Sequence, residues 1–159
     1  MTRIDEDSFY DLKKEMQGVI EELKEQEYKD WQIEPALNDI LDEINSNENL
    51  FTTYSKYGKT VLVDGTTGLV NVEPYLEISS HPSILYKLVL YLIENKDVKN
   101  ICFSVKSYYE KSSEIKRMID EKKFNKKLLD LKILLIWIRG YEDNIESFWE
   151  SMKHLKNIN

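Results

Sequence analysis

The chain has 159 residues, of which 42% are hydrophobic and 32% charged, with a net charge of −7 at neutral pH. A chain of this length and composition is expected to form one domain, residues 1–159, around one core. Its longest apolar stretch, residues 82–93, contains Lys87 and is much shorter than a membrane span, and its acidic start does not resemble a secretory signal, so we expect no membrane association and a cytoplasmic location.

The charge is distributed unevenly along the chain. Residues 1–49 hold 15 Asp and Glu against 5 Lys and Arg, whereas residues 50–159 hold 14 against 17. The first third is therefore net −10 and the remainder net +3. Such an uneven distribution of charge shapes the electric field that an approaching molecule meets. It carries information about partners rather than about the fold.

The residue usage also carries information about origin and redox state. Ile, Lys, Asn and Tyr are abundant while alanine occurs once, at Ala36, a pattern typical of an AT-rich bacterial or phage genome. The single cysteine, Cys102, cannot form an internal disulfide. Because it lies between Ile101 and Phe103, we expect it to be a small buried hydrophobic residue.

Two amphipathic helices are predicted in the acidic segment. Apolar residues at spacings of three and four predict the first helix over residues 7–26, and Pro35 in a first turn predicts the second, which ends near residues 45–47. The apolar positions that carry this prediction are Phe9, Leu12, Met16, Val19 and Leu23 in the first helix and Ile33, Leu37, Ile40, Leu41 and Ile44 in the second.

The pattern changes to β-branched and aromatic residues at Leu50. Turn signals at residues 57–59 and 64–68 separate three short strands and predict an antiparallel meander. The expected strands are residues 51–56, 60–63 and 69–72. The first of these is polar enough to lie at a sheet edge, where it could pair with a second copy of the chain.

The second half of the chain alternates helices and strands. A helix over residues 82–93 is apolar almost all round, so we expect it to be central and buried on more than one side. A strand at 100–105, a helix from Ser107 to about Lys123, and a strand at 131–138 follow. The last helix presents Ile145, Phe148, Trp149, Met152 and Leu155 on one face.

These elements predict an α+β (mixed α/β) fold. Two N-terminal helices, a three-stranded antiparallel meander and then α-β-α-β-α form one mixed sheet flanked by helices, with residues 1–49 as an acidic helical segment and 50–159 as the mixed-sheet core. Alternation in the second half favours parallel strands joined by right-handed crossovers. The apolar strand at 131–138 should lie in the sheet interior.

No common catalytic, cofactor or metal-binding motif is complete. Gly58-Lys59-Thr60 lacks the earlier glycine and the following helix of a phosphate-binding loop. The two histidines, His81 and His154, are far apart and have no cysteines near them, so we expect no metal site and no cofactor. His81 with its neighbouring serines is typical of a helix cap, and His154 of a helix C-terminus.

The element order from the N-terminal helices to Val105 is similar to the core of restriction-endonuclease-like nucleases. That resemblance implies a metal-dependent nuclease site in which Asp64 and either Glu73 or Glu77 supply the carboxylates. The Glu-x-Lys motif of the superfamily is missing, because Tyr75 and Ser79 stand where its lysine would be. The resemblance therefore implies a degenerate or weak site.

The hypothesis we favour is a protein-binding surface on the acidic helices. Its candidate residues are Glu21, Glu22, Glu25, Glu27, Asp39, Asp42 and Glu43, several of which oppose a helix dipole. Such a surface can mask a basic partner, as an immunity protein or inhibitor masks a nuclease toxin. Two alternatives are an ordinary solvated face, and an accessory subunit of a bacterial or phage complex. The basic residues of 111–132 are interleaved with acidic ones and the pI is near 5.0, so nucleic-acid binding is not expected.

Overall fold

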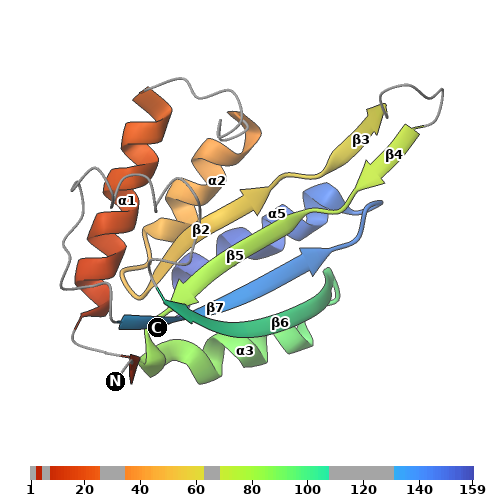
Figure 1. Ribbon diagram of the computed structural model, residues 1–159. Helices are drawn as coiled ribbons and strands as arrows, with labels where there is room; N and C mark the ends of the chain where they lie inside the picture. The colour runs from red at the N-terminus through yellow and green to blue at the C-terminus, as the bar shows by residue number, and fades with distance from the viewer. Residues whose placement is uncertain (1–2, 5–7, 26–34, 63–68, 108–130) are drawn as a thin grey trace.

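The computed structural model describes residues 3–4, 8–25, 35–62, 69–107 and 131–159 (Figure 1). Along the chain it contains β1 (Arg3–Ile4), α1 (Phe9–Glu25), α2 (Pro35–Asn45), β2 (Leu50–Lys56), β3 (Lys59–Leu62), β4 (Leu69–Val72), β5 (Tyr75–Ser80), the 3-10 turn η1 (Pro82–Ile84), α3 (Leu85–Glu94), β6 (Val98–Ser107), β7 (Leu131–Gly140), α5 (Ile145–Lys153) and the 3-10 turn η3 (His154–Asn157).

The fold is α+β, as predicted, with a five-stranded sheet. Strand β7 pairs with β5 on one side and with β6 on the other, and β2 lies beyond β5, so the predicted interior and edge positions are confirmed. Among the described strands, the one parallel pair is β1 with the start of β7, and it makes the sheet mixed. The prediction of parallel strands in the second half is wrong, since β6 and β7 are antiparallel. Alternation with helices fixes no strand direction when the connection is long, and here it spans 108–130.

The predicted meander is instead one long hairpin. Each of its two arms consists of two consecutive strands, and we call the break between them the joint. Strands β2 and β3 follow each other in one arm, and β4 and β5 form the other. At the joint, Gly58 has φ +93°, and a Cβ there would lie 2.8 Å from the backbone nitrogen of Pro74. Because β2 pairs with β5 and β3 with β4, residues 57–59 between β2 and β3 do not form a hairpin turn. Strand β5 was not predicted. Pro74 just before it would end a continuous strand pairing, but it lies opposite Gly58, where the ladder is already interrupted.

Helices α2, α3 and α5 cover one face of the sheet and enclose the core (Figure 1). Their apolar residues pack against alternate residues of the central strands, including Leu76 and Ile78 of β5 and Ile136 and Ile138 of β7. Helix α1 packs near the β2 edge against the other face, where the Phe9 and Phe51 rings lie 5.3 Å apart. The predicted apolar faces of the first two helices and the last helix are thus confirmed at their buried positions.

Two predictions of burial are wrong. Helix α3 buries only one face, through Leu88 and Leu92, and leaves an apolar stripe exposed on its outer side. It lies at the β6 margin of the helix layer, where no described element covers that side (Figure 1). Cys102 is also exposed, because it alternates with Ile101 and so lies on the sheet face opposite to the core under α3. The helix predicted from Ser107 to about Lys123 falls almost wholly outside the described residues.

Candidate functional site

A buried lysine joins the two acidic helices at one end of the molecule. Lys13 of α1 is only 9% exposed. Its ammonium Nζ donates to the carbonyl oxygen of Asn45 at 2.8 Å and to that of Asn47 at 2.6 Å, at and just beyond the end of α2. Burial disfavours the charged amine and lowers the pKa of Lys13, while the nearby carboxylate of Glu48 partly opposes this effect. The relative position of α1 and α2 is therefore fixed by interior contacts.

The predicted acidic residues fall into three groups. Glu21 near the end of α1 and Asp39 and Asp42 on α2 are exposed. Glu43 is half-buried and accepts an ion pair from Lys156 at 3.3 Å. Glu22 and Glu25 belong to α1 by their backbone, and Glu27 lies outside the described residues.

Glu48 was not among the predicted partner-binding residues. This side chain is exposed in the turn after α2, close enough to Lys13 to influence its pKa. No helical spacing pointed to it, because it lies between α2 and β2. We call the end of the molecule that carries α1 and α2 the acidic end, and its exposed or half-exposed acidic residues in the described chain include Asp11, Glu21, Asp39, Asp42, Glu43 and Glu48.

An aromatic group adjoins the acidic end and was also missed. The hydroxyl of Tyr10 donates to Asn49 Oδ1 at 2.8 Å, and its ring stacks on His81 with the centroids 5.4 Å apart. Tyr10 nevertheless remains exposed. Its partners come from the turn before β2 and from the end of β5, so only the folded chain brings them together.

The residues proposed from the nuclease resemblance do not form one site in the described chain. Glu77 is 4% exposed and accepts from Thr53 Oγ1 at 2.5 Å and from the hydroxyl of Tyr75 at 3.3 Å. Glu73 forms an ion pair with Lys99 of β6, and Asp64 lies outside the described residues. Burial and the Glu77 carboxylate both raise the pKa of Tyr75. The described residues contain no group of three or more His, Cys, Asp or Glu placed to hold a metal ion.

The remaining motif residues have structural roles that agree with their predicted ones. His81 Nδ1 accepts from the backbone N–H of Ser83 at 3.1 Å and caps η1, as expected. Lys59 and Thr60 lie in strand β3 and do not lead into a helix. His154 stands at the end of α5.

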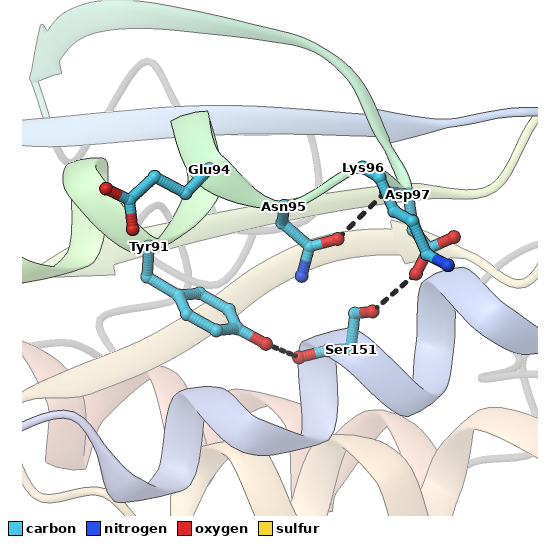
Figure 2. Close-up of a pocket in the computed structure, with 6 residues that line it drawn as sticks. All are labelled: Tyr91, Glu94, Asn95, Lys96, Asp97 and Ser151. Carbon is cyan, nitrogen blue, oxygen red and sulfur yellow. Dashed lines mark hydrogen bonds between the residues drawn. The ribbon is translucent and has the colours of Figure 1, made fainter.

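A hollow of about 390 Å³ lies between the α3–β6 turn and α5 (Figure 2). Figure 2 shows that several of its polar groups bond to one another: the Tyr91 hydroxyl donates to the Ser151 carbonyl at 2.7 Å, and Ser151 Oγ donates to Asp97 Oδ2 at 2.9 Å. Burial raises the pKa of Tyr91. These bonds fasten the turn to α5, so the hollow is best explained as a structural contact. It is lined by Tyr91, Glu94, Asn95, Lys96, Asp97 and Ser151.

Known proteins give no family for this chain. No family model, curated protein or solved structure matches it. None of the helices in the described part of the chain has the length and apolar character that a membrane crossing requires.

The surface chemistry of the acidic end bears on function. Its carboxylates project from two helices whose relative position is set by Lys13. Carboxylates arranged in this way attract cationic groups, and a rigid arrangement lowers the entropy cost of holding them. The chemistry that this end of the molecule supports is recognition of a basic surface.

Proposed function

We propose that this protein is a small acidic binding protein of the cytoplasm, of the immunity or inhibitor type, which masks a basic partner such as a nuclease toxin. The observation that carries the proposal is the acidic end, where exposed carboxylates on α1 and α2 are held in place by buried Lys13. The two described helices of the acidic segment, α1 and α2, lie at this end (Figure 1).

A protein that binds nucleic acid presents a positive cleft, and a complementary negative surface blocks it while accelerating encounter through electrostatic steering. Electrostatic steering depends on the net charge of the surface. Tight binding also needs a side chain that becomes buried at the interface and anchors the complex. Exposed Tyr10, whose ring is already fixed by His81 and Asn49, is suited to be that anchor.

The test is a pull-down from the native lysate at low salt with tagged protein, eluted by a salt step. The charge-reversed variant is Asp39→Lys with Asp42→Lys, and the matched control is Glu142→Lys with Asp143→Lys, two exposed acidic residues between β7 and α5. We expect the wild type and the control to retain the same basic protein and the charge-reversed variant to lose it.

The association rate of the retained protein then gives a second measurement. For the wild type it should fall steeply with added salt, and for the variant it should be slower by about tenfold or more at low salt. Equal rates for the variant and the wild type would contradict the proposal. Retention of several subunits of one assembly would favour the accessory-subunit alternative.

A further inference from the structure

We infer that the β6 edge and the outer stripe of α3 form a self-association surface, on which a second copy of this chain binds about a two-fold axis. This inference does not depend on the proposed function, because the surface lies at the opposite edge of the sheet from β2 and the acidic end.

The first observation is a group of large apolar side chains left open to solvent. They are Tyr86 (78% exposed), Ile93 (68%), Phe103 and Val105 (49% each) and Leu90 (42%). Together they expose on the order of 600 Å² of side chain, the upper end of what soluble monomers leave in one patch and most of the ~800 Å² that each partner buries in a standard interface.

These side chains lie on neighbouring elements. Tyr86, Leu90 and Ile93 recur at spacings of four and three, which places them along one side of α3. The opposite flank of α3 is occupied, because Tyr91 bonds to α5. The stripe lies on the side of α3 away from buried Leu88 and Leu92, and Figure 1 shows α3 running alongside β6 at this margin.

The apolar residues of β6 point to the same side of the sheet as α3. Phe103 and Val105 alternate with their neighbours in step with Ile101, which packs against the core cluster beneath α3. The stripe of α3 and these two residues thus border one another at the edge of the helix layer.

The second observation is that the two sheet edges differ. In the described chain β6 pairs only with β7, so its outer backbone groups have no strand partner there. At the other edge, the backbone N–H of Thr52 in β2 donates to Asn45 Oδ1 and the strand is bulged between Thr52 and Tyr54. Strand β6 is bulged at its start, between Val98 and Asn100, but pairs regularly with β7 from Asn100 to Ser107. A regular strand at a sheet edge is a template for another strand, whereas β2 is blocked and bulged in its middle.

Symmetry makes a second copy the occupant that fits. A two-fold axis perpendicular to the sheet, passing beside Phe103, pairs β6 antiparallel with β6 of the second copy and keeps both helix layers on the same side. Phe103 then faces its counterpart, and Ile101 faces Val105 of the second copy. The two α3 stripes meet above this apolar ladder.

Charge also favours this arrangement. Within the regular part of β6, Lys106 faces Asn100 of the second copy, so no like charges stand directly opposite between Asn100 and Lys106. Each chain carries a net charge of −7, which opposes association. Joining two copies at β6 places both acidic ends at the far edges of the combined sheet, where their repulsion is weakest.

The oligomeric state of the full chain tests the inference, measured by sedimentation velocity over a range of concentrations. The disrupting variant is Ile93→Lys with Phe103→Lys, and the matched control is Tyr54→Lys with Tyr141→Lys, two tyrosines that are each 40% exposed elsewhere. We expect dimers for the wild type and the control, and monomers for the disrupting variant with an unchanged circular dichroism spectrum. A wild type that stays monomeric up to about 100 µM overturns the inference.

Disulfide trapping tests the register. Cys102 faces Ser104 of the second copy, so Ser104→Cys should give covalent dimers on mild oxidation, because paired strands bring opposite Cα atoms within disulfide range. Asn100→Cys, which faces Lys106 instead, is the matched control and should give far fewer. Equal trapping of the two variants contradicts the Phe103-centred register, and dimers that persist in the Ile93→Lys, Phe103→Lys variant contradict the surface itself.

Discussion

Asn45 binds Thr52 through both ends of its side-chain amide. Its Oδ1 accepts from the Thr52 backbone N–H at 3.0 Å, and its Nδ2 donates to Thr52 Oγ1 at 2.8 Å. The last residue of α2 therefore satisfies a backbone donor of β2, which a neighbouring strand would otherwise have to satisfy. The contact joins the acidic end to the sheet and closes one edge of the sheet at the same point.

Replacing Asn45 should cost more stability than replacing Thr52. Asn45→Ala removes the acceptor of a largely buried N–H, and we expect a loss of about 1–3 kcal/mol in the free energy of unfolding. Thr52→Val keeps the N–H bonded to Asn45 and removes only the hydroxyl, so about 1 kcal/mol or less should be lost. Urea unfolding of both variants gives the comparison, and equal losses would show that the N–H contact is not the important one.

The lysine that joins α1 to α2 should be essential for stability. Lys13→Met keeps the length of the side chain but leaves two carbonyl oxygens without their donor, and we expect a loss of about 1–3 kcal/mol. The neighbouring Lys14→Met, at an exposed position, should change stability by no more than about 0.5 kcal/mol. The loss at Lys13 should persist in high salt, since buried contacts are screened little.

The same lysine predicts a pH dependence with a definite sign. The pKa of Lys13 is lowered from 10.5 in the folded protein, so the unfolded chain binds more protons in the interval just below 10.5. Stability of the wild type relative to Lys13→Met should therefore rise as pH increases through that interval. Chemical denaturation at a series of alkaline pH values measures this difference, and a decrease in the same interval would contradict the assignment.

Two glycines should respond in opposite directions to alanine. A Cβ at Gly140 would lie 2.5 Å from Cδ2 of buried Phe148, so Gly140→Ala should destabilise by about 1–3 kcal/mol. A Cβ at Gly18 in α1 meets nothing within 4 Å, and Gly18→Ala should stabilise by about 0.5–1 kcal/mol. Thermal unfolding of the two variants is the measurement, and a stable Gly140→Ala protein would mean that Phe148 can move aside.

Tyr75 should make the fold sensitive to alkaline pH. Its pKa is raised above 10.0 in the folded state, so the unfolded chain releases this proton first and stability falls as pH rises past 10.0. Tyr75→Phe removes this effect. Above pH ~10 the free energy of unfolding of the wild type should therefore fall more steeply than that of Tyr75→Phe, by up to about 1.4 kcal/mol per pH unit. Identical slopes above pH ~10 for the two proteins would contradict a protonated Tyr75.

The fold was predictable where the signal is local. Residues such as Leu12 and Met16 recur with the period of a helix and are buried as that period requires. Pro74 misled, because a proline ends strand pairing only where the ladder would have been continuous. The apolar run of α3 also misled, since apolarity in sequence does not reveal which side a neighbouring element covers.

The sequence predicted the negative charge of the candidate surface but not the contacts that hold it together. Charge counting located the acidic end, and helical spacing placed Asp39 and Asp42 on its exposed side. The contact that organises it joins Lys13 to Asn45 and Asn47, which are more than thirty positions away in the chain. Contacts over such separations have no periodicity, so only the assembled fold shows them.

Strand β7 comes last among the strands in the sequence but lies between β5 and β6. While the chain is being made on a ribosome, at about 5–20 residues per second, both of those strands emerge before their shared neighbour. The emerging chain must wait for Leu131–Gly140 before the two halves of its sheet can join. During that interval the edges of β5 and β6 that β7 will occupy are still without that partner.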